Sequence, residues 1–228
     1  MDYRKAYESW LADDRLNPEA RQELNAIAAD EKEIEYSFGA ELEFGTAGMR
    51  GIIGYGTNKM NVYTVSRATM GLSAFIKGLG QAAMDKGVVI SYDTRLKSRI
   101  FADAAASVLA ANGIKAYVFS DVHPVPMLSF AVRDLGTTAG IMITASHNPK
   151  QYNGYKVYGA DGAQMSPEDT KVVVDSIEKI TDYLSAPSPT AEQRKKYICE
   201  VPSKVDKNYY KELTKLTLSK KAVKACGK

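Results

Sequence analysis

Short apolar runs and helical patterns alternate along the middle of the chain, and this alternation narrows the possible folds more than any other feature. Residues 88–92, residues 114–119 and the run from Ala139 to Ala145 are short, apolar and rich in β-branched side chains, as buried strands are. Residues 98–113 and 124–135 carry helical patterns between them. This order implies right-handed crossovers between parallel strands. The sequence therefore predicts an α/β fold, with a mainly parallel sheet sandwiched by helices.

Composition divides the chain into three parts. Residues 1–40 are polar with helical patterns, and we expect them to form an N-terminal helical extension of the main domain. Residues 41–190 contain the alternating pattern and end in a linker, Ser-Ala-Pro-Ser-Pro-Thr. Residues 191–228 show one more strand pattern and one helix pattern, from Val205 to about Lys224, which together cannot bury a core. We therefore expect this last part to hold the first elements of a truncated second domain.

Charge and cysteine usage argue against several classes of protein. The net charge is +3, with no basic cluster interleaved with aromatic residues, so nucleic acid is not an expected partner. No apolar run approaches the length of a membrane span, and no signal segment follows the first residues. Cys199 and Cys226 are far apart, and with two histidines they do not make a zinc pattern. These features predict a soluble protein of the reducing cytoplasm, without a membrane partner.

A serine follows directly after the third apolar run. Ser146 is succeeded by His147, Asn148 and Pro149. Proline lacks an N–H for a sheet and disfavours helix at the preceding residue, so the chain must turn just after Ser146. Open α/β sheets bind their ligands at the carboxyl ends of the strands. We therefore expect Ser146 to be reactive, either as an acyl nucleophile or as a carrier of phosphate.

The neighbours of Ser146 favour the phosphate carrier. A serine hydrolase usually shows Gly-x-Ser-x-Gly and a remote histidine, but no glycine flanks Ser146 and His147 is its immediate neighbour. A phosphoserine carries roughly two negative charges and needs cations around it. The candidate cations are Arg50, which lies in a glycine-rich loop, His147 and Lys156. Taken alone, Arg50 could equally lie in solvent, and Lys156 could be a solvent-facing strand residue.

Two local patterns near the serine predict structure rather than chemistry. Arg95 follows Asp93 by two residues, and we expect the two side chains to pair. Asn153-Gly154 is a common two-residue turn between strands, and a second turn pattern follows at residues 160–162. The sequence therefore predicts a small β-hairpin appended to the sheet.

Three motifs, in order along the chain, resemble those of one protein family. Residues 45–51, 144–149 and 153–156 are similar to motifs of the α-D-phosphohexomutase family, of the phosphoglucomutase/phosphomannomutase type. The resemblance implies that the chain is an N-terminal domain fragment, phosphohexomutase domain I. It also implies that Ser146 is the catalytic phosphoserine and, through its phosphate, a ligand of Mg²⁺. The further roles that it implies are catalysis by Arg50, His147 and Lys156 and substrate binding by Thr46 and Asn148.

The implied reaction is an intramolecular phosphoryl transfer. By this resemblance, the enzyme interconverts hexose 1-phosphate and hexose 6-phosphate, glucose being favoured, with glucose 1,6-bisphosphate as intermediate and activator. The remaining active-site loops of the family belong to C-terminal domains, and no Asp-x-Asp-x-Asp metal loop occurs in this chain. We therefore expect residues 1–228 to be inactive alone. Two alternatives stay open: a phosphomannomutase or phosphopentomutase, and a truncated module without catalysis.

Overall fold

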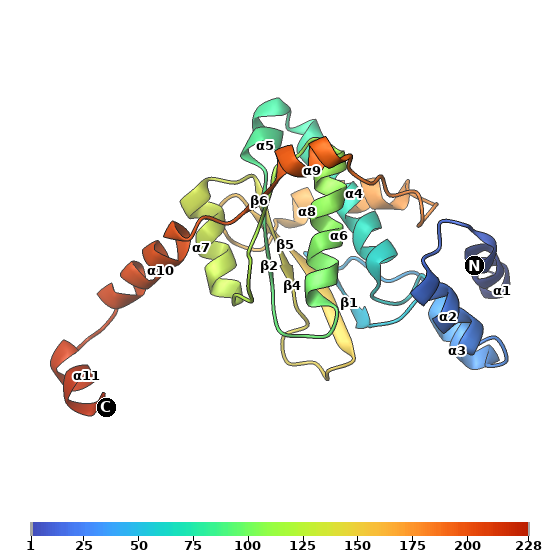
Figure 1. Ribbon diagram of the computed structural model, residues 1–228, viewed down its shortest axis with the longest axis horizontal. Coiled ribbons are helices and arrows are strands. Elements are labelled where there is room, and N and C mark those ends of the chain that lie inside the picture. The colour runs from blue at the N-terminus through green and yellow to red at the C-terminus, as the bar shows by residue number, and fades with distance from the viewer. Residues whose placement is uncertain (1, 228) are drawn as a thin grey trace.

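Residues 2–227, which the computed structural model describes, form a six-stranded sheet with helices packed on both faces (Figure 1). In the order in which they lie in the sheet, the strands are β1 (Gly48–Ile52), β5 (Tyr152–Gly159), β4 (Ala139–Ile143), β2 (Val88–Tyr92), β3 (Ala116–Val118) and β6 (Ile198–Glu200). The helices are α1 (Tyr3–Ala12), α2 (Pro18–Ala26), α3 (Glu31–Phe38), α4 (Val62–Gly78), α5 (Gln81–Lys86), α6 (Ser98–Ala111), α7 (Val125–Leu135), α8 (Pro167–Glu178), α9 (Ala191–Tyr197), α10 (Lys204–Lys215) and α11 (Lys220–Cys226).

The central strands are apolar throughout because both of their faces are covered. Side chains alternate between the two faces of a strand. Ile90 and Ile141 pack with α4, α6 and α8 on one face, whereas Val89 and Met142 pack with α7 on the other. Strands β2, β3, β4 and β6 run parallel, while β5 is antiparallel to β4 and β1 is antiparallel to β5. The predicted α/β fold is confirmed, with an antiparallel pair of strands at one edge.

The predicted turn at Asn153-Gly154 is wrong. Both residues lie within β5, where Gly154 stands opposite Arg50 of β1. Glycine is needed there for close packing, because a Cβ on Gly154 would lie 2.7 Å from the carbonyl oxygen of Thr144. The second predicted turn is present: the Gly162 N–H donates to Gly159 O, and an isolated antiparallel bridge follows β5. The appended hairpin is therefore limited to this bridge, and β5 itself is an internal strand of the sheet.

The first three helices form a cluster with its own apolar centre. Asn17 caps α2 by accepting a hydrogen bond from the Ala20 N–H, and Pro18 occupies the first turn, as the sequence predicts. Trp10 and Phe38 pack edge to face at the centre of the cluster, with ring centroids 5.5 Å apart. The cluster lies at one end of the sheet and includes Tyr183 from the main domain (Figure 1). The division of the chain into three domains stays a prediction.

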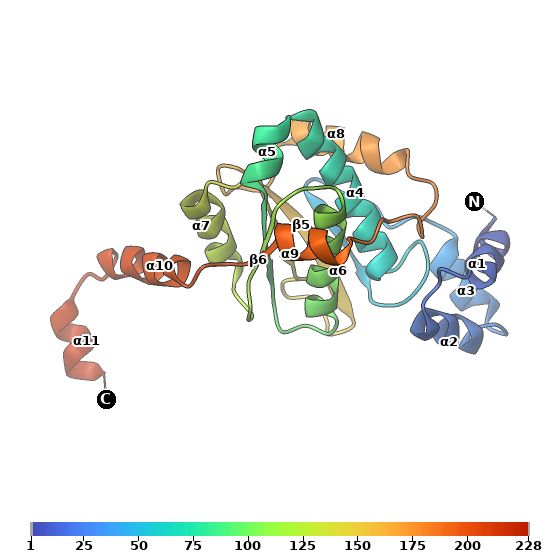
Figure 2. The ribbon, with the colours of Figure 1, turned by 45° about the horizontal axis from the view of Figure 1, so that its top comes forward.

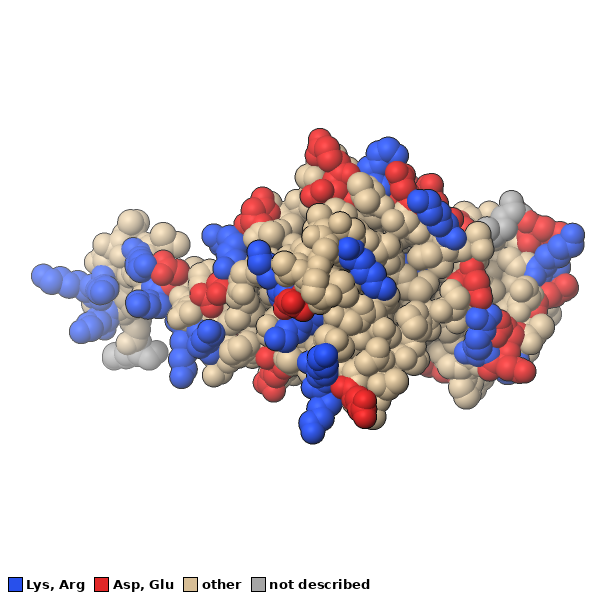
Figure 3. Space-filling view, turned by 90° about the horizontal axis from the view of Figure 1, so that it is seen from above, with Lys and Arg blue, Asp and Glu red and all other residues tan. Residues whose placement is uncertain are grey.

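The C-terminal part begins within the main sheet and then leaves it. Strand β6 pairs in parallel with β3, so residues 198–200 extend the sheet. The single helix predicted from Val205 to Lys224 is wrong: α10 and α11 are separate, and Ser219 caps the second of them. Helix α10 packs against α7, where Val205 is buried, and the rest of the tail runs away from the sheet (Figure 2). Lys and Arg side chains gather over this tail (Figure 3). Within residues 2–227, none of the helices has both the length and the apolar character that crossing a membrane requires.

Candidate active site

Ser146 lies on a tight turn that follows β4. Thr144 and Ala145 are still buried, whereas Ser146 and His147 are exposed. The Asn148 N–H donates to the Ala145 carbonyl at 3.1 Å, and the Ser146 N–H donates to Thr144 Oγ1 at 3.0 Å. Ser146 has a φ of 57°, in the left-handed region that residues other than glycine rarely adopt. The predicted turn is therefore present, and the hydroxyl lies at the carboxyl end of a parallel strand.

A carboxylate at the end of the neighbouring strand anchors this turn. Asp93 follows β2, and its Oδ2 accepts a hydrogen bond of 2.6 Å from Thr144 Oγ1. Its Oδ1 accepts hydrogen bonds from Ser98 Oγ at 2.8 Å and from the Arg95 N–H at 3.0 Å. Arg95 Nε also lies 3.4 Å from Asp93 Oδ2, so the predicted pair is confirmed. The ends of β2 and β4 are thus joined by side chains as well as by the sheet.

The guanidinium of Arg95 also donates to backbone carbonyls of the serine turn, which was not predicted. Its Nη2 donates to the carbonyls of Ser146 and Asn148, each at 2.7 Å. Its Nη1 donates to the carbonyls of Pro149 at 3.0 Å and Tyr152 at 3.2 Å. All four acceptors are main-chain groups, so no pattern of residue types could have indicated these bonds.

Arg50 approaches the serine turn from the edge strand β1. Its Nη1 donates to Asn148 Oδ1 at 2.8 Å, which joins two of the predicted site residues. The expectation that Arg50 lies in a glycine-rich loop is wrong, because residues 48–52 pair with β5 as a strand. Gly48 makes this pairing possible, since a Cβ there would lie 2.1 Å from the carbonyl oxygen of Tyr155. The Arg50 residue is exposed, so its cation can meet an anion from solvent.

Thr46 precedes β1, and Lys156 lies in β5, the strand that pairs with β1. Thr46 is exposed on the turn that precedes β1. Lys156 stands opposite Gly48, two residues from Gly154, which stands opposite Arg50. Because alternate residues of a strand share a face, Lys156 and Arg50 point to the same face of the sheet. Lys156 is half-buried, and within residues 2–227 its ammonium group makes no hydrogen bond or ion pair.

His147 contacts the serine hydroxyl but does not form a catalytic triad with it. Its Nδ1 lies 3.3 Å from Ser146 Oγ. A triad also needs an acidic group that orients the histidine, and no carboxylate bonds to this ring among the described residues. The second histidine, His123, instead stacks on Phe119 and lies 3.4 Å from Asp206 Oδ1. This geometry does not support a serine hydrolase.

The residues around Ser146 do not make a magnesium site by themselves. No group of three or more His, Cys, Asp or Glu side chains converges within residues 2–227. The nearby carboxylate of Asp93 is already engaged by Thr144, Ser98 and Arg95. Mg²⁺ requires octahedral oxygen ligands, usually from carboxylates, water and phosphate. The side chains present therefore do not fit a complete Mg²⁺ site.

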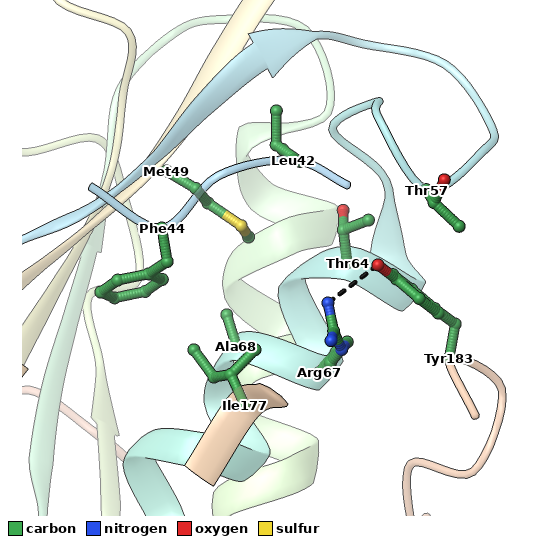
Figure 4. Close-up of a pocket in the computed structure, with 9 residues that line it drawn as sticks. All are labelled: Leu42, Phe44, Met49, Thr57, Thr64, Arg67, Ala68, Ile177 and Tyr183. Carbon is green, nitrogen blue, oxygen red and sulfur yellow. Dashed lines mark hydrogen bonds between the residues drawn. The ribbon is translucent and has the colours of Figure 1, made fainter. Parts of the chain in front are cut away.

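A pocket between α4, the end of α8 and the segment before β1 is structural. Its volume is about 10 Å³, which is room for about one water molecule (Figure 4). Arg67 donates from Nη1 to the Tyr183 hydroxyl and to Glu41 Oε2, each at 2.8 Å. Its Nε donates to the Ile180 carbonyl at 2.8 Å. Because the Arg67 cation is paired and none of the lining residues belongs to the serine turn, this pocket is not part of the candidate site.

The fold and the serine turn together define an α/β/α domain that presents an exposed serine beside an arginine and a histidine. This chain belongs to the phosphoglucomutase/phosphomannomutase family, since residues 41–184 match the family's α/β/α domain I. The resemblance predicted from the three motifs is thereby confirmed.

Known proteins similar to this chain include phosphoglucomutases of Staphylococcus aureus. That of strain USA300 is 43% identical over 176 residues, which are 77% of this chain and 31% of that protein. A solved protein of Thermus thermophilus, assigned as a phosphomannomutase, is 33% identical with a TM-score of 0.56, over 69% of this chain and 35% of that one. A phosphoglucomutase/phosphomannomutase family protein of Burkholderia thailandensis shares the fold, with a TM-score of 0.56 at 21% identity over 73% of this chain and 34% of that one. The chain therefore spans under a third of the length of the curated relatives it matches.

Proposed function

We propose that Ser146 carries the phosphoryl group of a mutase that interconverts hexose 1-phosphate and hexose 6-phosphate, with glucose as the favoured sugar. One observation supports this most: Ser146 is exposed at the carboxyl end of β4, and Arg50 reaches the same turn through Asn148. The absence of a triad around His147 in the described residues argues against acyl transfer. Family membership and the named function of the Staphylococcus aureus relatives support the mutase reaction.

The proposed reaction moves one phosphoryl group in each of two steps. First, a hydroxyl oxygen of the hexose monophosphate attacks the phosphorus of phosphorylated Ser146. The bond from phosphorus to Ser146 Oγ breaks, and the sugar hydroxyl gives its proton to a base. The hexose bisphosphate, glucose 1,6-bisphosphate for glucose, then presents its other phosphate. Ser146 Oγ attacks that phosphorus, the sugar oxygen leaves and takes a proton, and the phosphoserine is restored.

The surrounding side chains have distinct proposed roles. Arg50 neutralises charge on the transferring phosphoryl group, since such transfer depends mainly on positioning and electrostatic stabilisation. Lys156 exchanges the proton of the reacting sugar oxygen: its neutral amine accepts the hydroxyl proton when that oxygen attacks, and its ammonium group returns a proton when the sugar oxygen leaves. His147 contacts the Ser146 hydroxyl at 3.3 Å and can donate to the oxyanion that forms there. Thr46 and Asn148 contact the substrate.

The rest of the site is proposed to come from C-terminal domains of the same enzyme. A Mg²⁺ ion would take one ligand from the phosphate on Ser146, and its other ligands would lie beyond the described residues. The sugar-phosphate substrate is likewise held in part by those domains, so residues 1–228 alone should be inactive. A cytoplasmic location is part of this proposal.

A Ser146→Ala variant of the full-length polypeptide tests the proposed function. Its conversion of glucose 1-phosphate to glucose 6-phosphate should fall to background in a coupled assay with glucose 1,6-bisphosphate and Mg²⁺. Ser120→Ala is a matched control, because Ser120 is exposed and follows β3, another parallel strand of the same sheet. Wild-type turnover in Ser146→Ala, or an equal loss in Ser120→Ala, would reject the assignment of Ser146.

A second candidate is a folded module without catalysis, because no group of metal-binding side chains converges within residues 2–227. The matched residues span 31% of the Staphylococcus aureus enzyme, so a gene product of this length would lack most of a mutase. The reading frame that follows Lys228 distinguishes the two possibilities. A frame that encodes the remaining domains supports the mutase, and an immediate stop codon supports the module.

A further inference from the structure

Arg95 holds the serine turn through an unusual set of contacts. The Arg95 guanidinium donates to four carbonyls between Ser146 and Tyr152. The Arg95 side chain is only 14% exposed, although its bonds to the Ser146 and Pro149 carbonyls lie at the exposed surface. Asp93 fixes the same guanidinium on its other side, with Nε and Oδ2 3.4 Å apart. Bonds from a charged donor are stronger than those between neutral groups.

These contacts determine which groups of the turn face solvent. The Ser146 carbonyl points at Arg95. In a trans peptide the carbonyl and the following N–H point in opposite directions, and none of the described peptides is cis. The His147 N–H therefore points away from Arg95, and within residues 2–227 it donates no hydrogen bond. Ser146 itself is exposed and has a left-handed φ of 57°.

Asp93 connects both sides of this arrangement. Its carboxylate accepts the Thr144 hydroxyl, and that hydroxyl accepts the Ser146 N–H. The Thr144 contact fixes the backbone before Ser146, and the bonds from Arg95 fix the carbonyls of Ser146 and the residues after it. The Asp93–Arg95 pair, which is partly exposed, therefore contacts the backbone on both sides of Ser146.

We infer that Arg95, oriented by Asp93, is a positioning residue that holds Ser146 and the His147 N–H in the conformation needed for phosphoryl transfer. The inference rests on the proposed function of Ser146. Arg95 acts through the backbone and does not itself touch the phosphate. Lysine cannot replace it fully, because a single ammonium group lacks the planar fork that reaches several acceptors at once.

Hydrogen exchange on residues 1–228 tests whether Arg95 orders the serine turn, and this measurement does not require enzyme activity. In Arg95→Ala, the amides of residues 144–152 should exchange faster than in the wild type, while the other peptides keep their rates. Arg99→Ala is the matched control: Arg99 lies four residues away and bonds Asp103 and Tyr92, not the serine turn. Unchanged exchange over residues 144–152 would overturn the inference, and so would faster exchange spread evenly over the chain.

Kinetics of the full-length enzyme test whether the order that Arg95 imposes on the turn is needed for phosphoryl transfer. Displacing a reacting group by about 1 Å can cost about 10²-fold in rate, so Arg95→Ala should lower kcat by about that factor with little change in KM. Added guanidinium ion should restore part of the kcat of Arg95→Ala. The kcat of Arg95→Lys should lie between those of the wild type and Arg95→Ala. Arg99→Ala should keep the wild-type kcat. A wild-type kcat in Arg95→Ala, or a loss that guanidinium does not rescue, would overturn the positioning role.

Failure of the proposed mutase function and failure of the Arg95 inference can be distinguished. If the wild-type enzyme has no mutase activity, the proposed function fails, and the exchange measurement still decides whether Arg95 orders the turn. If the wild type is active and Ser146→Ala is not, a normal Arg95→Ala enzyme rejects the Arg95 inference alone.

Discussion

Replacing Ser146 by glycine should give a more stable protein than replacing it by alanine, although both changes remove the proposed nucleophile. Ser146 has a φ of 57°, and the left-handed conformation costs an L-residue about 1–2 kcal/mol. Glycine avoids this cost but adds about 0.4–1 kcal/mol of chain entropy to the unfolded state. The difference makes Ser146→Gly about 1 kcal/mol more stable than Ser146→Ala.

The comparison isolates the backbone because both variants lose the same side-chain contact. The Ser146 hydroxyl bonds His147 Nδ1 at 3.3 Å on the exposed surface, and neither glycine nor alanine can replace that bond. The Ser146 N–H still donates to Thr144 in both variants. The measurement is the free energy of unfolding in urea, supported by thermal melting. A difference of about 1 kcal/mol corresponds to about 2–4 °C in Tm for a chain of this size.

The same pair of substitutions at Ser9 provides a control of opposite sign. Ser9 is exposed within α1, where glycine is about 0.8–1 kcal/mol less favourable than alanine. If Ser146→Gly is no more stable than Ser146→Ala while Ser9 behaves as expected, the turn does not hold Ser146 in a strained conformation. That result would refute the argument that the fold imposes this geometry on the serine.

Two further predictions concern stability. Burial raises the pKa of Tyr155 above its ordinary value of 10.0, so the unfolded chain loses this proton first as the pH rises. The free energy of unfolding should therefore fall as the pH rises above about 10, and Tyr155→Phe should flatten this fall in urea titrations at several pH values; an unchanged slope would contradict the assignment. Thr144→Val removes the hydroxyl that joins Asp93 to the Ser146 N–H and should destabilise the chain by about 1–3 kcal/mol, whereas Thr144→Ser should retain most of the stability. Equal stability of the valine and serine variants would show that the bridge contributes nothing.

The parts of the fold that were predictable are those set by local burial and by breakers. The run from Ala139 to Ala145 is apolar because β4 is covered on both faces, and Pro149 forces the turn that exposes Ser146. Both features depend on residue types that lie close together in the sequence. The class of fold and the position of the serine can therefore be derived from the sequence.

The features that were mispredicted depend on contacts between distant segments. Asn153-Gly154 has the composition of a turn, but its glycine serves close packing between β1 and the end of β4. Arg50 follows glycines that suggest a loop, yet one of them, Gly48, lets β1 pair closely with β5. Arg95 was correctly paired with Asp93, but its bonds to backbone carbonyls depend on the path of the chain and not on residue identity. Sequence patterns do not distinguish a glycine needed for a turn from one needed for close approach.

Locating the phosphoryl group on the working enzyme is the most direct test of the proposed role of Ser146. The full-length enzyme would be incubated with hexose phosphate carrying radiolabelled phosphate, digested, and mapped by peptide. We predict that the label appears on the peptide that contains Ser146 and is chased off by unlabelled hexose phosphate during turnover. Label on another residue, or label on Ser146 that the substrate cannot remove, would contradict the proposal.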